Sequence, residues 1–502
     1  MPIAKIHSRA LLGIHAPAVT VEAHVAPGLP AFTLVGLPET AVRESRDRVR
    51  AAILSSGFEF PPRRLTVNLA PADLPKESAR FDLAIALAIL AATGQLPAPA
   101  RERLAHIECL GELSLDGSLR SVRGNLSAAR AARDAGRELL LPADGQAEAE
   151  LIPGVAGRGL HHLRDLVAYL AGEADPVRLE HRPPPPVDPA INGDLADVRG
   201  QPRAKRALAI AAAGKHNLLL IGPPGAGKSM LAQRLAGILP PMTEEEALAA
   251  AEVATVTPGG FDPTRFGERP FRAPHHSASA VALIGGGSHP APGEISLAHH
   301  GTLFLDELPE FDRRVLEALR EPLEAGSVMI SRAARHARFP ADFQLIAAMN
   351  PSPQGSEIHS RAAQRYRAKV SGPLLDRIDI HLEVPRVPAT DLDQAQPDGE
   401  DSQTVRERVI AARQRMRARQ GVVNARLDAA GVAEHIVLAQ PERHMLNRAI
   451  EQLNLSGRAR ERILKLARSI ADYEDRDAID SAALAEAIGY RNLDRLFSGG
   501  MS

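Results

Sequence analysis

The residues most able to do chemistry lie in a glycine-rich loop between an apolar segment and a helical one. The loop, GPPGAGKS, follows the apolar run NLLLI and precedes SMLAQRLAGIL. Its glycines let successive backbone N–H groups turn toward phosphate oxygens at a helix N-terminus, while Lys228 can reach the β and γ oxygens and the Ser229 hydroxyl can bind Mg²⁺. A flexible turn is the alternative, which the strand–loop–helix context disfavours. The predicted phosphate site consists of Gly222, Pro223, Pro224, Gly225, Ala226, Gly227, Lys228 and Ser229.

Two later apolar segments each end in polar residues that complete such a site. Asp306 and Glu307 follow the run TLFL, and Asn350 follows FQLIAAM. Because ligands bind at the carboxyl ends of parallel strands, these side chains are expected beside the loop. Asp306 would hold the metal through its water shell, Glu307 would polarise the attacking water, and Asn350 would orient that water. A solvated strand end fits Glu310 better than this pair, whereas Asn350 before a proline could also be a plain turn.

Two proline-rich segments divide the sequence into three parts. Residues 1–180 alternate apolar and polar positions and also contain helical periodicity, which predicts an α+β domain. After a linker at 181–191, residues 192–385 alternate short strands with helices, as in an α/β core with a parallel sheet. A second linker at 386–403 precedes residues 404–502, which have helical spacing and no convincing strand. The expected fold is therefore multidomain α/β with a helical C-terminal lid.

Composition narrows the class of protein further. A chain of 502 residues exceeds the size of one hydrophobic core, and its formal charge of -1 requires any nucleic-acid contact to come from local basic surfaces. The single Cys109 excludes an intramolecular disulfide and a cysteine-based metal cage. The apolar stretch at 83–93 is about half the roughly 20 residues needed to cross a membrane, so we expect a buried helix and a cytoplasmic protein.

The sequence resembles the AAA+ ATPases and, within them, the magnesium-chelatase-like family. The resemblance covers nearly the whole chain and is carried by DLADVRGQPRAKRALAIAAAGKHNLLLIGPPGAGKS, FRAPHHSASAVALIGGG, PGEISLAHHGTLFLDELPEF and SGPLLDRIDIHLEVP. It implies ATP and Mg²⁺ as cofactors and a ring, most often a homo-hexamer. It also implies roles for Asn350 as sensor 1, Arg377 as an arginine finger, and Arg458, within LSGRARERILKLAR, as the sensor 2 arginine.

Each arginine would have a distinct task in such a ring. Arg377 would lie at a subunit edge and reach the neighbour's γ-phosphate, while Arg458 would tie the lid to the phosphate of its own subunit. An internal ion pair with Asp376 or Asp379 is the alternative for Arg377. The segment after Asn350, PSPQGSEIHSRAAQRYRAKV, lacks the cysteines found in many members of the family, which leaves a zinc-ordered loop in doubt.

The first part of the chain is similar to the Lon-protease-type domain with the ribosomal S5-like fold. That domain uses a Ser–Lys pair, but PKESARFD places Arg80 at the nucleophile position, and Leu126 lies near the position of the base. Ser78 and Lys76 are two residues apart and would not face each other on a helix. We therefore expect a binding or assembly role rather than peptidase activity.

Three segments could contact DNA. His275, His276 and Ser277 belong to FRAPHHSASAVALIGGGSH, which resembles a pore-facing insertion, although a loop that supports the active site is an equal alternative. Residues 327–344 predict a hairpin with Arg332, Arg335 and Arg338 near its turn. The segment 406–419 holds six arginines and could form a basic face or an ordinary solvated helix. With no Trp and 16 Phe and Tyr residues, contacts should be electrostatic and independent of sequence.

The family resemblance implies ATP-driven helicase and branch-migration activity on DNA, integrating incoming single strands during natural transformation. The alternative is a chelatase-type motor that remodels a protein partner for metal insertion, which the phosphate motifs alone do not separate from the first. A nucleotide-gated scaffold is a third interpretation, and Glu307 disfavours it because a scaffold needs no residue to activate water.

Overall fold

The computed structural model describes residues 3–36, 40–74, 76, 79–182, 193–287, 290–332, 335–353, 360–388, 399–453 and 455–493. They form two compact units, Met1–Pro185 with Ala251–Phe266, and Pro186–Ala250 with Gly267–Ser502. The segment Ala251–Phe266 thus joins the first unit from within the sequence of the second. Most of the linker expected at 181–191, and residues 389–398 of the linker expected at 386–403, lie outside the described residues.

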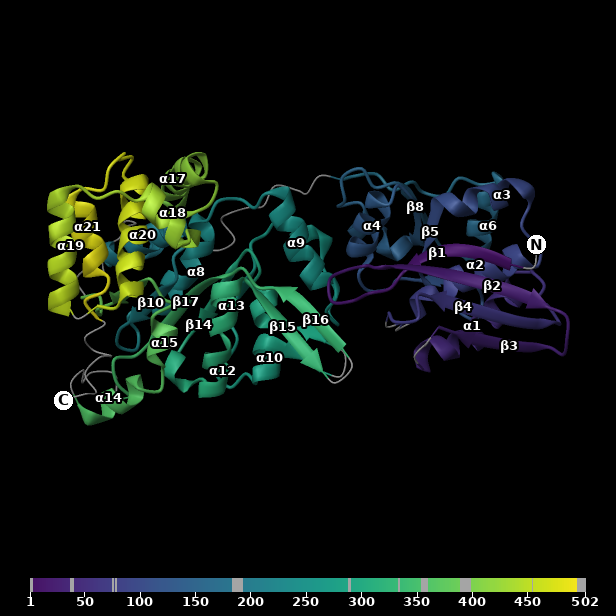
Figure 1. The fold of residues 1–502 in the computed structure, drawn as a ribbon, viewed down its shortest axis with the longest axis horizontal. Coiled ribbons are helices and arrows are strands. Elements are labelled where there is room, and N and C mark those ends of the chain that lie inside the picture. Colours follow the sequence, from purple (N-terminus) through teal and green to yellow (C-terminus); the bar gives the residue numbers. More distant parts are fainter. Residues whose placement is uncertain are drawn as a thin grey trace. The chain divides into compact units, whose positions relative to one another are not determined.

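The first unit is built on a seven-stranded mixed sheet in the order β3-β4-β2-β1-β5-β8-β9 (Figure 1). Strand β2 pairs antiparallel with β1 and β4, and the remaining neighbours are parallel. In β2 the side chains of Val19, Val21 and Ala23 are buried while their neighbours face outward, which confirms the alternation seen in the sequence. The strands of this sheet are β1 Ile3–Arg9, β2 Ala18–Ala26, β3 Ala31–Val35, β4 Arg64–Ala70, β5 Ile107–Cys109, β8 Glu138–Pro142 and β9 Gly157–Leu160. A separate antiparallel pair is formed by β6 Glu112–Leu113 and β7 Leu119–Arg120.

Helix α2 (Asp82–Ala92) occupies the core of this unit, and every one of its residues is buried. A helix that is apolar all round needs an apolar environment on every side, and here the environment is β1, β2 and the neighbouring helices. The predicted buried helix is confirmed, and no described helix is long and apolar enough to span a membrane. The other helices of this unit are α1 Thr40–Ser55, α3 Ala98–Arg103, α4 Asn125–Asp134, α5 Gln146–Ala149 and α6 Leu163–Ala171.

The second unit contains a five-stranded parallel sheet in the order β11-β14-β17-β10-β18. Strands β10, β14 and β17 are buried along their whole length, which explains why they occur in the sequence as continuous apolar runs. The predicted parallel sheet is therefore confirmed. Its strands are β10 Leu218–Ile221, β11 Phe271–Arg272, β14 Thr302–Leu305, β17 Gln344–Met349 and β18 Ile380–Glu383.

Short helices and two small hairpins complete the core of the second unit. The hairpin predicted at 327–344 forms from β15 (Ser327–Arg332) and β16 (Arg335–Pro340), and the other pairs β12 (Gly285–Gly286) with β13 (Ala291–Pro292). Its helices are α7 Pro202–Gly214, α8 Lys228–Ile238, α9 Glu244–Thr255, α10 Ala280–Ile284, α11 Glu294–Leu297, α12 Arg313–Ala318, α13 Arg320–Ala325, α14 Arg361–Arg367 and α15 Gly372–Leu375. Helix α9 continues into the segment assigned to the first unit.

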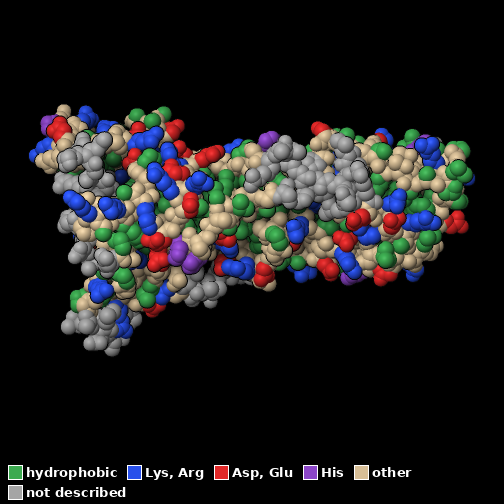
Figure 2. Space-filling model, turned by 90° about the horizontal axis from the view of Figure 1, so that it is seen from below, with side chains coloured by type: hydrophobic (Ala, Val, Ile, Leu, Met, Phe, Trp, Pro, Cys, Tyr) green, Lys and Arg blue, Asp and Glu red, His purple; other side chains and the backbone are tan. Residues whose placement is uncertain are grey.

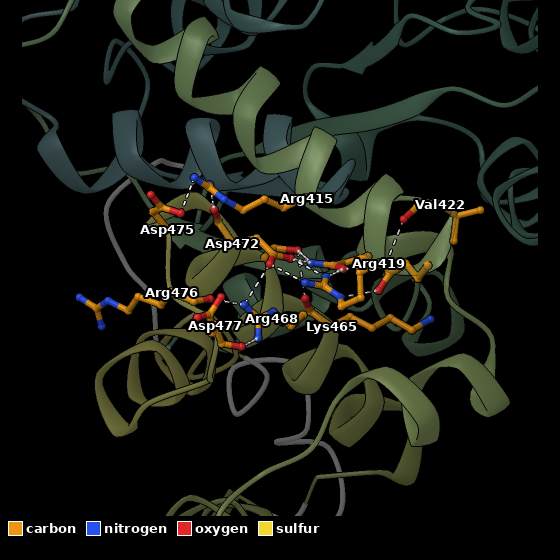
Figure 3. A network of polar contacts seen from close by, with 12 residues as sticks. Arg415, Arg419, Val422, Lys465, Arg468, Asp472, Asp475, Arg476 and Asp477 are labelled. Carbon is orange, nitrogen blue, oxygen red and sulfur yellow. Dashed lines mark hydrogen bonds and ion pairs between the residues drawn. The ribbon is translucent and has the colours of Figure 1, made fainter.

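The C-terminal region is helical, as predicted, and is organised around a buried carboxylate (Figure 3). Asp472 accepts two hydrogen bonds of 2.7 Å from Arg419, one of 2.9 Å from Arg468 and one of 2.9 Å from Asn424. These contacts fasten α17 and α20 together. The helices are α17 Ser402–Gln420, α18 Ala429–His435, α19 Gln440–Leu453, α20 Gly457–Tyr473 and α21 Ser481–Gly489.

Candidate nucleotide-binding site

The glycine-rich loop leaves β10 at Gly222 and enters α8 at Lys228. A side chain at Gly222 would clash with the Val384 carbonyl, which would lie 2.1 Å from a Cβ atom. Gly225 and Gly227 have positive φ angles of 77° and 85°, and a Cβ atom at either would meet nothing within 4 Å. The first N–H groups of α8 have no partner within the helix and can donate to an anion. The loop is thus open in front of a helix N-terminus and fits a phosphate group.

Lys228 joins this loop to the end of strand β17. Its Nζ donates to the carbonyl oxygens of Gly222 at 2.7 Å and Pro223 at 3.0 Å, and to Oδ1 of Asn350 at 3.1 Å. Burial lowers the pKa of Lys228, although the charges of Asp306 and Glu307 oppose that shift. The structure therefore brings Lys228 and Asn350 together from two adjacent strands, as the parallel sheet requires.

Ser229 and Asp306, the two candidate Mg²⁺ ligands, are in direct hydrogen-bond contact. The Ser229 hydroxyl donates to Oδ2 of Asp306 at 2.6 Å, while Oδ1 of Asp306 accepts the backbone N–H of Glu307 at 2.9 Å. A hydroxyl and a carboxylate oxygen are ligands that Mg²⁺ accepts, directly or through water. Their proximity fits a Mg²⁺ ion bound with a nucleoside triphosphate.

Glu307 contacts His276, a residue that the sequence offers as a DNA contact. Its backbone is left-handed, with φ 52° and ψ 46°, and its carboxylate Oε2 lies 3.1 Å from Nδ1 of His276. His275 instead bonds the Ser277 hydroxyl at 2.8 Å. Of the three DNA candidates in this segment, His276 is therefore next to the candidate catalytic carboxylate. The contact was missed because Glu307 and His276 are far apart in sequence and no motif links them.

Arg377 follows α15, and its side chain is largely buried. Its side chain is only 8% exposed, pairs with Glu324, and donates to the Pro373 carbonyl at 2.6 Å. An internal ion pair thus forms, but the partner is Glu324 rather than Asp376 or Asp379. The arginine-finger role predicted for Arg377 therefore requires its ion pair with Glu324 to break.

The carboxylate of Asp379 is held by three other residues rather than by Arg377. His216 lies 3.2 Å from the carboxylate, Arg462 lies 3.5 Å away, and the backbone N–H of Asn217 donates to it at 3.1 Å. Burial alone would raise the pKa of Asp379, but the His216 hydrogen bond and the Arg462 charge hold it below its usual range. Asp379 precedes β18, so these contacts mark the edge of the sheet where the strands begin.

Arg458 is exposed on α20, one helical turn before Arg462. Because Arg462 forms an ion pair with Asp379, this part of α20 lies near the amino ends of the strands, whereas the phosphate loop follows the carboxyl end of β10. Among the described residues, Arg458 makes no hydrogen bond or ion pair with the phosphate loop, and its expected role, a tie from the lid to the phosphate of its own subunit, stays a prediction.

The hairpin arginines are only partly described. Arg338 on β16 is exposed and donates to the Ser327 hydroxyl at 3.0 Å, whereas the side chains of Arg332 and Arg335 lie outside the described residues. On the face drawn in Figure 2, Lys and Arg side chains are interspersed with Asp and Glu rather than gathered in one broad patch.

The arginines of α17 do not form an open basic face. Arg413 donates to the Ala212 carbonyl at 2.6 Å, Arg406 to the Gly237 carbonyl at 2.8 Å, and Arg419 to Asp472. Arg415 donates to the Asp472 carbonyl at 2.8 Å and also pairs with Asp475, as Figure 3 shows. The interpretation of this run as a nucleic-acid surface is wrong for these four residues, because their guanidinium groups bind α17 to its neighbours.

In the first unit, buried side chains lie at or near the positions of the Ser–Lys pair of a Lon-type peptidase. Arg80 is 2% exposed and donates to the Arg123 carbonyl at 3.1 Å, and its burial lowers its pKa to about 10. Lys76 is fully buried against the Pro71 carbonyl, and Leu126 is fully buried as well. Ser78 and residues 354–359 of the cysteine-free loop lie outside the described residues.

A parallel sheet that presents a phosphate loop, adjacent carboxylates and an asparagine at one edge defines an AAA+ type nucleotide-binding fold. This chain belongs to the family of magnesium chelatase subunit ChlI. The family model for that subunit matches residues 194–392, a second ChlI model matches 21–145, and the model of the ChlI C-terminal region matches 399–491.

Relatives that match over the full length extend the family assignment. The protein YifB of Salmonella typhimurium is 50% identical, covering 99% of this chain and 98% of its own. The competence protein ComM of Haemophilus influenzae is 48% identical, covering 99% of both chains. The magnesium-chelatase 67 kDa subunit of Chlorobaculum parvum is 27% identical over 160 residues, which are 32% of this chain and 23% of its own.

Proposed function

We propose that this chain is an ATPase that assembles as a ring, most often a homo-hexamer, and drives branch migration of DNA during natural transformation. The observation that carries the ATPase proposal is the convergence of Lys228, Asn350 and the Ser229–Asp306 pair at one edge of the sheet. The DNA proposal is supported by the full-length similarity to a protein named for competence.

In this proposal each residue of the site has a defined task. The phosphate loop and Lys228 bind ATP, and Ser229 and Asp306 hold Mg²⁺, which when bound neutralises charge on the phosphates. Glu307 orients the attacking water, and Asn350 holds that water from the other side. His276 lies 3.1 Å from Oε2 of Glu307, and the Glu307 side chain is half exposed, so its second carboxylate oxygen is available to a water molecule.

Arg377 would act on the nucleotide of a neighbouring subunit after release from Glu324. Arg458 is exposed, and it lies one helical turn from Arg462, which pairs with Asp379 where the strands begin rather than where the phosphate loop lies. We therefore propose that Arg458 also acts on the nucleotide of a neighbouring subunit. This assignment replaces the role within one subunit that the sequence resemblance implied. Both arginines supply planar charge that stabilises developing charge on phosphate oxygens.

The division into an S5-like, Lon-type domain at 1–180, an AAA+ core at 192–385 and a lid at 404–502 is part of the proposal. Buried Arg80 and Lys76 in the first domain support a role in binding or assembly rather than peptide hydrolysis. DNA contacts would come from Ser277, His275 and the hairpin arginines Arg332, Arg335 and Arg338. A cytoplasmic location stays a prediction.

A chelatase-type motor that remodels a protein partner for metal insertion is the second candidate. It is favoured by the family descriptions, all three of which name the ChlI subunit. Measuring ATPase activity of assembled rings with single-stranded, duplex and branched DNA separates the two functions. Stimulation by DNA supports the branch-migration proposal, and ATPase that ignores all three kinds of DNA contradicts it in favour of protein remodelling.

A further inference from the structure

A polar cavity of about 200 Å³ lies in the second unit, at the edge of the sheet opposite the phosphate loop. Lys215 precedes β10, Gly301 precedes β14, and Asp342 precedes β17, and all three line the cavity. The loop, Asp306 and Asn350 follow the other ends of these strands. With a rise of about 3.3 Å per residue, the strands separate the two sites by roughly 13–20 Å.

The lining of the cavity is strongly cationic. Five of its side chains carry positive charge and two carry negative charge, a net of three positive charges. Burial and the nearby Lys215 lower the pKa of His300, so that ring adds no charge near neutral pH. The cationic residues are Lys215, Arg269, Arg413, Arg417 and Arg426, and the acidic ones are Glu246 and Asp342.

Each carboxylate in the cavity is shared between two cations. Asp342 accepts from Lys215 at 2.6 Å and also from Arg426. Glu246 accepts from Arg269 at 2.9 Å and lies 3.7 Å from Arg417, whose side chain is 51% exposed. Since each carboxylate balances one charge, these four cations are only half neutralised.

Arg413 has no carboxylate partner among the described residues. Its guanidinium, on a residue only 7% exposed, donates through Nε and one Nη to the carbonyls of Ala212 and Ala213 at 2.6–3.3 Å. Its burial, together with the charge of Arg269, lowers its pKa to about 9. A buried charge that meets only neutral acceptors is stabilised by any anion that enters beside it.

We propose that this cavity binds a phosphate-class oxyanion, of the size of inorganic phosphate or pyrophosphate, at a site separate from the nucleotide. The volume is below the roughly 300–1,000 Å³ of most ligand pockets, so a whole nucleotide does not fit. Guanidinium groups bind such oxyanions through paired hydrogen bonds. Because the lining comes from α17, from the segment that follows it and from the sheet edge, the bound anion holds the lid against the core.

The test uses the full-length Lys228→Ala variant, in which the phosphate loop has lost its lysine, titrated with pyrophosphate by calorimetry at low salt. We expect binding that Arg417→Gln and Arg426→Gln each weaken about tenfold or more, the usual effect of removing a charge-assisted hydrogen bond. Pyrophosphate should also raise the melting temperature of Lys228→Ala, and raise it less once either arginine is replaced.

Arg448→Gln is the matched control, since Arg448 is exposed on α19 and does not line the cavity. In the Lys228→Ala background, the Arg448→Gln variant should bind pyrophosphate with unchanged affinity.

The proposal fails if Lys228→Ala binds no pyrophosphate, or if both cavity variants bind it as tightly as the control. Displacement of pyrophosphate by a short single-stranded oligonucleotide overturns it as well, because the site would then belong to a nucleic-acid backbone. Arg417 is half exposed, so its variant keeps the test valid if Arg426→Gln does not fold.

Discussion

Lys228 shares its ammonium group among two loop carbonyls and Asn350, and each of these contacts is to a neutral oxygen. A phosphate that enters the loop offers charged oxygens instead, which make stronger hydrogen bonds to an ammonium group. The lysine can therefore exchange partners while Asn350 becomes free to meet water. In the proposed function, the loop therefore binds phosphate by exchanging the hydrogen-bond partners of Lys228.

Replacing Glu307 by Gln should leave ATP binding intact and lower turnover by about 10²–10⁴, because an amide cannot accept the proton that a carboxylate takes from water. The measurements are equilibrium nucleotide binding and steady-state ATPase rate. Glu310→Gln is the control, since Glu310 is exposed and pairs with Lys369. Hydrolysis at the rate of the unmodified protein would remove Glu307 from the proposed role.

Lys228→Ala should weaken ATP binding itself, because the loop loses the cation that reaches the β and γ phosphates. The loss should appear in a direct binding measurement with a non-hydrolysable analogue, which separates it from the turnover defect of Glu307→Gln. Unchanged affinity would show that the phosphate loop is wrongly assigned.

At the scale of elements, the arginines of α17 show why a charge pattern predicts a surface poorly. Six arginines and one acid suit a polyanion when only their own helix is considered. Their acceptors, among them Asp472 and the Ala212 and Gly237 carbonyls, come from other helices. A window along the sequence does not contain those partners. The strands were predictable because β10, β14 and β17 are buried on both faces and so consist almost entirely of apolar residues.

Asp472→Ala should destabilise the C-terminal helical region by about 3–5 kcal/mol, because it leaves the buried Arg468 and Asn424 and the partly buried Arg419 without their carboxylate. Urea unfolding followed by circular dichroism measures the effect. Asp475→Asn is the matched control: Asn tolerates the left-handed backbone at this position, where φ is 59°, and the ion pair of Asp475 with Arg415 is largely exposed, so it should contribute about 0–1 kcal/mol. Equal losses for the two variants would mean that Asp472 does not organise α17 and α20.

Replacing Arg332, Arg335 and Arg338 together by Ala should reduce the salt dependence of DNA binding. For every phosphate group that the protein no longer neutralises, the slope of log affinity against log salt should fall by roughly 0.7–0.9. Basal ATPase should persist, since none of the three is assigned to the nucleotide, while stimulation by DNA should fall. An unchanged slope would mean that DNA binds elsewhere than on the hairpin.

For the whole molecule, the motifs predicted which residues meet at the candidate nucleotide site, because the phosphate loop, Asp306 and Asn350 each follow a strand of one parallel sheet. The sequence did not predict the partners of Arg377 or the surroundings of Arg458. Glu324 lies on a helix about fifty residues from Arg377, and α20 meets the sheet through Asp379 rather than near the loop. Such contacts depend on how helices pack, and no local pattern encodes them. The segment Ala251–Phe266 joins the first unit for the same reason.

Arg377 supplies the test of the assembled ring. Arg377→Ala should keep ATP binding in each subunit but lose hydrolysis by about 10³-fold or more, as when an arginine finger is removed from other NTPases. Mixed rings of Arg377→Ala and Glu307→Gln subunits contain some interfaces where an intact Arg377 faces an intact Glu307. Because such interfaces are complete, partial ATPase should return on mixing two inactive variants. Glu324→Gln, which frees Arg377 without removing it, should retain activity in the same assay. Mixed rings of confirmed assembly that recover no activity would show that Arg377 acts within its own subunit or only stabilises the fold through Glu324.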